Sequence, residues 1–382
     1  MDIELLRARA AIIRNIRRFF DERAYLEVDT PVLAPDLIPE ACLEVFKTTR
    51  LPAINSKKQR ARDYWLVPSP EIWMKKLIAV HRTDMYQICK CFRNCESSGF
   101  MHSPEFTMLE YYTMNTDYMD SLYITEALFN ALLVNLKGIA GSFAETLTES
   151  SLSPPFVRWT MDEAFSRLAG FSLIEKLENG TLPQEARRLG LDIQDGMDDG
   201  EIYNLIFIHT IEPRLPKEKP LALLDYPAAV PCLAKLNETP TEAPDEALKG
   251  TPAPPSSEAH NAPRPGGGEA RQAARTRQRW ELYVNGIELA NCYSEETDAE
   301  EVRNFFLSEQ EAKTKNAAVP HTVDENYWKI FSPTKEPTKE RGGSHFPRCS
   351  GVALGLDRLI MALTGRKTID SVLPFPMEMS LY

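Results

Sequence analysis

The sequence has no long apolar run. Met1 leads directly into a charged amphipathic stretch, IELLRARAAIIRNIRRFF, which is neither a signal-peptide core nor a bilayer-spanning segment. We therefore expect a cytoplasmic protein with no membrane segment. Positive charge is also scarce, because 44 Lys and Arg residues face 55 Asp and Glu residues and give a net charge of −11. This deficit argues against a surface that binds nucleic acid through bulk electrostatics.

Cysteine is sparse, and its number is odd. Seven scattered cysteines fit reduced thiols better than a disulfide framework. Cys89, Cys91 and Cys95 cluster, but the spacing C-x-C-x3-C lacks the paired ligands of a structural zinc site. Buried apolar cysteines are therefore the favoured interpretation. The GVALG segment that ends at Gly355 also lacks the third glycine of a dinucleotide-binding fingerprint.

Length and composition favour one large domain with an insertion. The 382 residues are 43% hydrophobic and 26% charged, which is typical of a globular protein that buries a large core. Between Pro240 and Pro265 there are seven prolines, followed by three glycines. Such a segment cannot bury enough apolar surface to offset its ordering entropy. We expect a folded domain made of residues 1–237 and 276–382, interrupted by a flexible insertion at 238–275.

Apolar periodicity predicts an α+β fold with antiparallel strand pairs. Helical spacing covers residues 4–23, 71–81, 117–136, 160–215 and 299–315, and another helix follows Gly355. Strands are expected at 25–32, at 65–70, on both sides of the 92–102 loop, and around Asn285-Gly286, a hairpin signal. Pro31 cannot donate a ladder hydrogen bond, so the 25–32 segment is expected at an edge or interface where a partner chain docks.

The hairpin from Phe92 to Tyr112 carries the most informative pattern. Alternation on its two strands predicts one shared face with these residues: Gln87, Cys89, Cys91, Arg93, Phe106, Met108, Glu110 and Tyr112. A forked arginine suits a phosphate and an aromatic face suits a purine base. The hairpin therefore favours nucleotide binding. The alternative is a half-buried amphipathic hairpin with incidental charges.

Five motifs in order carry a resemblance to a known family. The hairpin, the segment at Pro31, and GLDR before an apolar helix resemble the three motifs of class II aminoacyl-tRNA synthetases. SPEIWMKKL and IELANCYSE resemble the SPEL-x-LK and EIGN-x-x-SE segments of the lysine enzymes in that family. The resemblance runs from about residue 4 to 376, apart from the insertion. It implies an antiparallel sheet flanked by helices, and a homodimer.

Other features bring the chain nearer to a tRNA-independent branch of that family. The helix of the first motif starts at once, so we expect no anticodon reading of tRNA. The segment from Glu212 to Pro220, IELAN and CSGVALG resemble members that attach lysine, preferably (R)-β-lysine, to a lysine of elongation factor P. Ala290 replaces the synthetases' glycine, as in that branch. An added methyl in a pocket wall shifts selection between close isomers by roughly 1–3 kcal/mol.

The resemblance implies that the amino-acid carboxylate attacks the α-phosphorus of ATP and that an acceptor amine then attacks the adenylate. Arg93 would bind the α-phosphate and Arg358 the γ-phosphate. Phe106 would stack on adenine, with His102 near the triphosphate. The family reads Arg-Asn-Glu, whereas this chain has an extra cysteine, so either Glu96 takes that role through a longer loop or the contact is missing.

The same resemblance assigns the acidic residues. Glu281 and Glu288 would meet across the Asn285-Gly286 turn and bind Mg²⁺ together with ATP, although composition alone favours exposed strand carboxylates. A diamino acid needs carboxylates at both ends of its pocket. These would be Glu71 for the reacting-end amine and, for the distal amine, Glu110 and Glu295 with Tyr112 and Asn291. Bound cations would balance the three acids.

Two alternatives remain. One is a free-standing lysyl ligase that acts on another acceptor, such as tRNA. The other is a non-catalytic relative that binds a partner or senses an amino acid. Retention of Arg93, Glu281, Glu288 and Arg358 argues against lost catalysis, because a binding relic has no physical need for phosphate and magnesium ligands.

Overall fold

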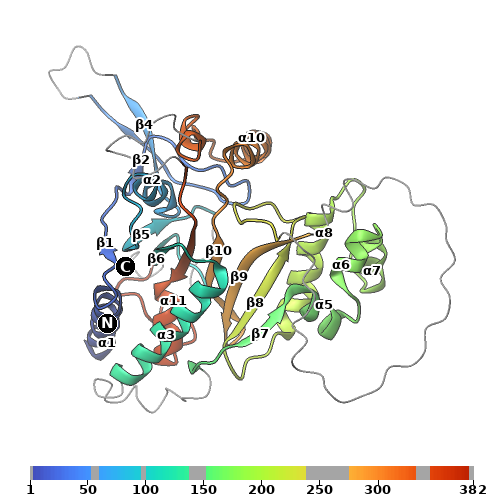
Figure 1. The fold of residues 1–382 in the computed structure, drawn as a ribbon, viewed down its shortest axis with the longest axis horizontal. Coiled ribbons are helices and arrows are strands. Elements are labelled where there is room, and N and C mark those ends of the chain that lie inside the picture. Colours follow the sequence, from blue (N-terminus) through green and yellow to red (C-terminus); the bar gives the residue numbers. More distant parts are fainter. Residues whose placement is uncertain are drawn as a thin grey trace.

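The computed structural model describes residues 3–52, 60–95, 100–136, 152–237, 275–332 and 345–377. Within these ranges, an eight-stranded sheet has the order β1-β5-β6-β11-β10-β9-β8-β7 and a three-stranded sheet has the order β2-β4-β3. The large sheet is antiparallel except for the pairs β1 with β5 and β7 with β8. This architecture confirms the predicted α+β fold with an antiparallel sheet flanked by helices (Figure 1).

The large sheet consists of β1 (Leu26–Glu27), β5 (Met85–Phe92), β6 (Glu105–Met114), β7 (Val157–Thr160), β8 (Leu221–Pro227), β9 (Thr276–Val284), β10 (Ile287–Ser294) and β11 (Cys349–Gly355). The small sheet consists of β2 (Leu33–Ala34), β3 (Lys47–Arg50) and β4 (Arg62–Leu66). The longer described helices are α1 (Ile3–Asp21), α2 (Glu71–His81), α3 (Tyr118–Leu136), α10 (Ala299–Asn316) and α11 (Leu356–Thr364). A block between β7 and β8 contains α5 (Met161–Ala169), α6 (Leu173–Glu178), α7 (Leu182–Arg188), α8 (Asp199–Ile206), η1 (Phe207–Ile211) and η2 (Glu212–Arg214), and η3 (Tyr327–Ile330) follows α10.

Local chemistry explains most of these boundaries. The helix predicted at 71–81 is confirmed, with Pro70 as its N-cap residue. Thr160 and Glu163 form the capping box that begins α5. Asn285 and Gly286 both have positive φ, at 54° and 77°, as the tight turn between β9 and β10 requires.

The strand predicted at 25–32 is wrong for most of its length. Only Leu26 and Glu27 pair with β5, and the chain then continues without regular structure to β2. Pro31 lies in this irregular stretch, where the missing amide proton costs no ladder bond. The insertion predicted at 238–275 lies outside the described residues except for Arg275. None of the helices in the described ranges combines the length and apolar character needed to cross a bilayer.

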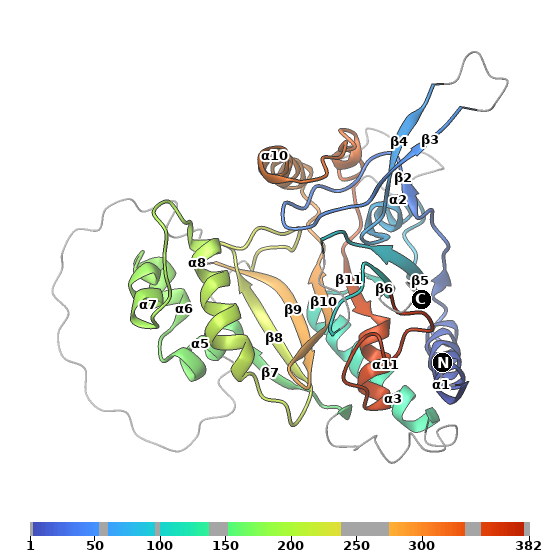
Figure 2. The same cartoon turned by 180° about the vertical axis from the view of Figure 1, so that it is seen from behind.

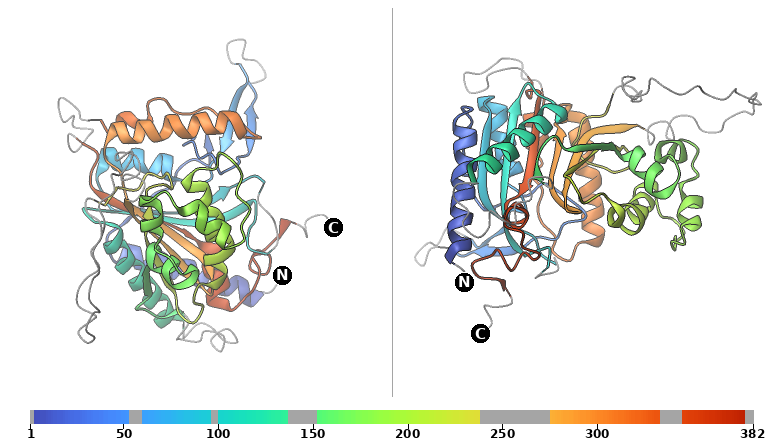
Figure 3. Two further views of the ribbon diagram at one scale, coloured as in Figure 1. Left: turned by 90° about the vertical axis from the view of Figure 1, so that its right-hand side faces the viewer. Right: turned by 90° about the horizontal axis from the view of Figure 1, so that it is seen from below.

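Helices cover the two faces of the large sheet unequally. On one face α1, α3 and α11 enclose a continuous apolar core with the sheet. On the other face, α2, α10 and η3 pack over the β5 end and the α5–α8 block packs over β7 to β9. Figure 1 shows α10 at the top and the α5–α8 block at the right, and Figure 2 shows the same arrangement from behind. In the right panel of Figure 3 the block lies at the opposite end of the molecule from α1.

A buried ion pair ties α1 to the sheet and to α11. Arg9 Nη1 lies 2.6 Å from Asp357 Oδ1, and the backbone N–H of Thr107 donates to Asp357 Oδ2 at 2.6 Å. The Arg9 and Asp357 side chains are only 13% and 2% exposed. Arg9 also donates to the Thr107 hydroxyl at 2.9 Å. Three elements distant in sequence therefore meet at one carboxylate.

Replacement of Arg9 by methionine should leave the Asp357 carboxylate buried without a charged partner. Because breaking a buried pair leaves an uncompensated charge, we expect the free energy of unfolding to fall by about 3 kcal/mol in a denaturant titration. Arg7→Met is the matched control on the same helix, because the pair that Arg7 makes with Glu4 is 69% and 55% exposed and should contribute less than about 1 kcal/mol. Equal losses in the two variants would contradict this interpretation.

Candidate active site

A row of polar side chains crosses the sheet face that lies opposite α1, α3 and α11. The strand register aligns Gln87, Glu110, Asn291 and Glu281, with Ala353 of β11 between Glu110 and Asn291. Residues directly opposite each other on neighbouring strands point to the same face. The row therefore forms the floor of the site. The predicted shared face of β5 and β6 is confirmed by the pairs Gln87 with Glu110, Cys89 with Met108 and Cys91 with Phe106.

The central strand β11 presents only small residues to this floor. Gly351, Ala353 and Gly355 alternate with Val352 and Leu354, which are completely buried in the apolar core. A Cβ atom at Gly351 would lie 2.5 Å from Tyr112 Cε1 and 2.7 Å from Glu295 Oε1. The absence of a side chain at Gly351 thus leaves the space that the tyrosine and the carboxylate fill.

Glu110 is buried, and both of its oxygens accept hydrogen bonds. The Ser69 hydroxyl donates to Oε2 at 2.8 Å and the Tyr112 hydroxyl donates to Oε1 at 2.7 Å. Ser69 Oγ also accepts a hydrogen bond from the backbone N–H of Glu71 at 3.0 Å. The first residue of α2 is therefore fixed next to β6.

A buried lysine bridges the other two acids. Lys75 Nζ lies 2.5 Å from Glu71 Oε1 and 2.5 Å from Glu295 Oε2. The Tyr293 hydroxyl donates to Glu71 Oε1 at 3.3 Å. Glu71, Glu110 and Glu295 converge as predicted. The expectation that bound cations alone balance them is wrong, because the Lys75 ammonium already neutralises part of their charge.

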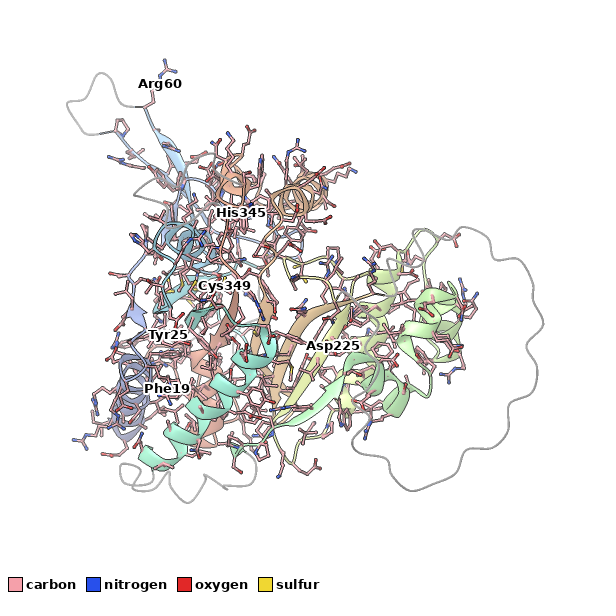
Figure 4. All side chains as sticks on the ribbon, in the orientation of Figure 1. Phe19, Tyr25, Arg60, Asp225, His345 and Cys349 are labelled. Carbon is pink, nitrogen blue, oxygen red and sulfur yellow. The ribbon has the colours of Figure 1, made fainter. Side chains whose placement is uncertain are left out.

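The position of Glu295 is set by the backbone just beyond β10. Its N–H donates to the carbonyl oxygen of Cys349 at 3.0 Å. Cys349 begins β11 and lies in the middle of the molecule in Figure 4. The carboxylate therefore emerges beside the small residues of the central strand.

Burial and mutual repulsion shift the protonation of this cluster. Burial, together with the charge of Glu71, raises the pKa of Glu110 to about 7. Burial raises the pKa of Glu295 to about 8 against the opposing effect of Lys75. Burial favours the neutral form of Lys75, but Glu295 and Glu71 outweigh it and raise the pKa of the ammonium above its usual range. Near neutral pH the cluster therefore holds a charged lysine and carboxyls that still bind protons.

A second acidic group lies farther along the row. Glu281 Oε1 lies 2.6 Å from Arg279 Nη2, and Glu281 Oε2 accepts from the Tyr283 hydroxyl at 2.8 Å. Arg279 Nε donates to Asn291 Oδ1 at 3.2 Å. Burial and the charge of Glu281 raise the pKa of Glu288 to about 7. The network holds Glu281 and Asn291 in fixed orientations.

The donor chemistry of Glu281 and Glu288 fits magnesium, which binds hard oxygen ligands. The charge of Glu281 disfavours the ionised form of Glu288, and a divalent cation between them would relieve that repulsion. Within the described ranges, no group of three or more His, Cys, Asp or Glu side chains is arranged to hold an ion by itself. Such a pair suits an ion whose other ligands come from phosphates.

The two predicted phosphate ligands are held by their surroundings. The guanidinium carbon of Arg93 lies 5.3 Å from the centre of the Phe106 ring, and its buried Nε has no hydrogen-bond partner among the described residues. Arg358 Nη1 donates to the carbonyl of Glu288 at 2.7 Å, and its Nε donates to the carbonyl of Met101 at 3.3 Å. Arg358 follows Asp357 at the start of α11, so the buried pair with Arg9 anchors it.

Glu281 and Glu288 are not directly opposite each other, which corrects the prediction. Glu288 pairs with Tyr283 and Glu281 pairs with Asn291. The two-residue turn places Glu288 opposite Tyr283, which is two residues from Glu281, so both carboxylates lie on the same face of the sheet. A β-bulge between Glu288 and Ala290 then adds one residue between the partners of Tyr283 and Glu281. Their separation along β10 is therefore larger than a regular hairpin would give.

The same bulge overturns the prediction for Ala290. Regular strand alternation would place Glu288, Ala290 and Cys292 on one face, but Ala290 pairs with Leu282 and Leu354 and lies in the apolar core. Its methyl group points away from the carboxylates. The predicted direct contact of this methyl with the amino acid is therefore wrong.

The remaining predicted residues are placed as follows. Tyr112 is buried beside Glu110, and Asn291 is half-buried on the floor. His102 is half-buried in the segment that leads into β6. Glu96 lies outside the described residues, so the effect of the additional Cys95 stays a prediction.

The site residues to which the sequence assigned no role include Ser69, Lys75, Arg279, Tyr283 and Tyr293. Lys75 falls on the lysine of the SPEL-x-LK segment, but four residues after Glu71 a lysine is also typical of the solvated face of an amphipathic helix. Arg279 shares a strand face with Glu281, two residues away, and that spacing was the available signal.

Residues 3–379 match the family described as tRNA synthetases class II (D, K and N), and the chain belongs to this family. The elongation factor P--(R)-beta-lysine ligase of Avibacterium paragallinarum is 30% identical over 376 residues, which cover 98% of this chain and 96% of that protein. The protein of the same name from Vibrio atlanticus is 30% identical over 380 residues, covering 99% and 97%. A lysine--tRNA ligase from Pelotomaculum thermopropionicum is also 30% identical, over 98% of this chain and 63% of that protein.

Substitution of Gly351 by alanine tests the small-residue floor. The added Cβ would overlap the Tyr112 ring and the Glu295 carboxylate, so we expect the KM for lysine to rise by about tenfold or more and the stability to fall by about 1–3 kcal/mol. Gly355→Ala is the control, because its nearest atoms would be 3.7 Å away. Lysine-dependent exchange of pyrophosphate with ATP measures the KM. Comparable values for the two variants would rule out this role for Gly351.

Proposed function

We propose that the protein uses ATP to activate (R)-β-lysine or lysine as an aminoacyl-adenylate and transfers the aminoacyl group to a lysine side chain of elongation factor P. The observation that carries the proposal is the convergence of Glu71, Glu110 and Glu295 on one face of the sheet. They lie next to the β5–β6 hairpin, whose arginine and aromatic ring suit a nucleotide. The names of the relatives that match nearly the whole chain support the acceptor.

In the first step, an oxygen of the amino-acid carboxylate bonds to the α-phosphorus of ATP as pyrophosphate leaves. Arg93 and Arg358 supply positive charge where the phosphate oxygens gain negative charge. Phe106 offers its ring to the base. Magnesium held by Glu281 and Glu288 would neutralise phosphate charge.

In the second step, an unprotonated amine of the acceptor attacks the acyl carbon, an amide bond forms and AMP leaves. Glu71 accepts hydrogen bonds from the amine near the reacting end of the amino acid. Glu110 and Glu295 accept hydrogen bonds from the distal ammonium, with Tyr112 and Asn291 beside them. A diamino acid brings two positive charges to this acidic pocket, which a neutral side chain cannot match.

Acceptor and amino acid can be tested in one experiment. The protein is incubated with ATP and either lysine isomer, in the presence of elongation factor P or of tRNA, and intact masses are measured. We expect a mass increase of one lysyl group on elongation factor P and none on tRNA. Modification of tRNA alone would favour the alternative suggested by the lysine--tRNA ligase relative.

Removal of either phosphate ligand should stop activation. Arg93→Ala and Arg358→Ala each remove a charge that stabilises the transition state, so we expect the rate of lysine-dependent pyrophosphate exchange to fall by about 10²–10³-fold. Circular dichroism should show an unchanged fold. Arg348→Ala is a control, because its pair with Asp117 is on the surface. Near-normal exchange in the Arg93 or Arg358 variant would refute its role.

We also propose a homodimer that forms along the β1 edge. Among the described residues, β1 has a strand partner on one side only, and Leu26, Val32 and Leu33 nearby in the sequence are exposed apolar side chains. An exposed edge strand with apolar neighbours is suited to association with a second copy.

Light scattering at micromolar concentration should give twice the mass of the chain. The double variant Val32→Glu, Leu33→Glu should give the monomer mass, because it places charge in the proposed contact. Ile208→Glu alters an equally exposed apolar residue in the distant α5–α8 block and should remain dimeric. A monomeric unaltered protein would contradict the proposal.

A further inference from the structure

Lys75 is a charged residue at the centre of the pocket, and the proposed chemistry gives it no task. Its side chain is 1% exposed, as is that of Glu295, and that of Glu71 is 15% exposed. Both carboxylates lie 2.5 Å from Nζ. The ammonium therefore occupies the type of position that a substrate ammonium would take between two acids.

Stability alone gives little reason for a lysine at this position. The cost of removing two or three charges from water roughly cancels their attraction, and apolar residues of similar volume often serve the fold as well. The neighbouring apolar residues of α2, Ile72, Met74 and Ile78, already pack into the core. The charge of Lys75 therefore calls for another explanation.

Counting charges provides one. Glu71, Glu110 and Glu295 carry three negative charges when ionised, and Lys75 neutralises one of them. Two negative charges remain, which matches the two ammonium groups of a diamino acid. The substrate carboxylate would face the arginines at the phosphate end.

We propose that Lys75 is a positioning residue that sets specificity: its ammonium is a fixed counter-ion that orients Glu71 and Glu295 and offsets one of the three acidic groups, so that the pocket takes a substrate with two ammonium groups. This inference rests on the proposed function. In this proposal, the protein supplies one of the three positive charges that balance the three acids, and the substrate supplies the other two.

Protonation of the cluster should follow the substrate. The other titratable groups that face Lys75 come from β6, β10, η3 and β11, and they are Glu110, Tyr112, Tyr293, Tyr327 and Cys349. Because the carboxyls of Glu110 and Glu295 have pKa values of about 7 and 8, the KM for lysine should decrease as the pH rises from 6 to 9. Because Lys75 lowers the pKa of Glu295, that pKa should rise in its absence, and the KM profile should move to higher pH.

The first test compares Lys75→Met with Lys76→Met. Lys76 is adjacent but points to Asp324, 2.7 Å away, with 33% of its side chain exposed. We expect Lys75→Met to raise the KM for lysine at pH 7 by about tenfold or more, to shift its pH profile upward by about one unit, and to leave the KM for ATP unchanged. Lys76→Met should match the unaltered protein. A KM that rises equally at all pH values would show a merely structural role and overturn the proposal.

The second test adds Glu295→Gln. Glu295→Gln alone leaves one net negative charge in the pocket and should bind lysine poorly. Adding Lys75→Met restores two negative charges, so the double variant should have a lower KM than Glu295→Gln. Lys75→Met should thus raise the KM for lysine in the otherwise unaltered protein and lower it in the Glu295→Gln variant. If it raises the KM in both, the charge balance is wrong. If Lys75→Met alone does not fold, the comparison of the double variant with Glu295→Gln still tests the proposal.

A measurement without substrate separates this inference from the proposed function. A carboxyl that binds its proton more tightly in the folded state contributes less to the stability of the protein as pH rises through the folded-state pKa. Between pH 7 and 9, the free energy of unfolding should therefore fall more steeply in Lys75→Met than in the unaltered protein. The double variant can be compared with Glu295→Gln in the same way. Identical slopes would overturn the role of Lys75. Absence of lysine-dependent exchange in the unaltered protein would instead overturn the proposed function.

Discussion

The central strand β11 keeps small residues on one face and large ones on the other, and the site depends on that asymmetry. Val352 and Leu354 anchor the strand in the core, while Gly351 and Ala353 leave the opposite face almost bare. Side chains from β6 and β10 can therefore meet across β11. Over Gly351 that space is filled by Tyr112 and Glu295, so the missing side chain lets the acidic cluster pack directly on the backbone of β11.

Charged groups are paired on both sides of the sheet. Basic and acidic groups are paired within the protein before any substrate binds: Arg279 with Glu281 and Lys75 with Glu71 and Glu295 on the site face, and Arg9 with Asp357 between α1 and α11. Arg93 lies over an aromatic ring, and Arg358 donates to two backbone carbonyls and lies 3.9 Å from the Glu288 carboxylate. In the proposed function, both guanidinium groups would also contact phosphate oxygens.

Periodicity and turn chemistry predicted much of the fold. The helix at 71–81, the capping box at Thr160 and the turn at Asn285-Gly286 depend on local interactions, which a sequence displays directly. Lys75 could not be found in this way, because its burial depends on acids that are distant in sequence. The strand at 25–32 failed because β propensity does not provide a pairing partner. Ala290 was misplaced because nothing in IELAN marks a bulge.

The bulge in β10 divides one strand into two segments with opposite phase. Before it, Glu288 faces the site beside Arg358; after it, Asn291 and Tyr293 face the site beside Glu281 and Glu71. A regular strand with these residues would have turned one of the two sets into the apolar core. In the proposed function, the single extra residue would therefore let one continuous strand contact both the nucleotide and the amino acid.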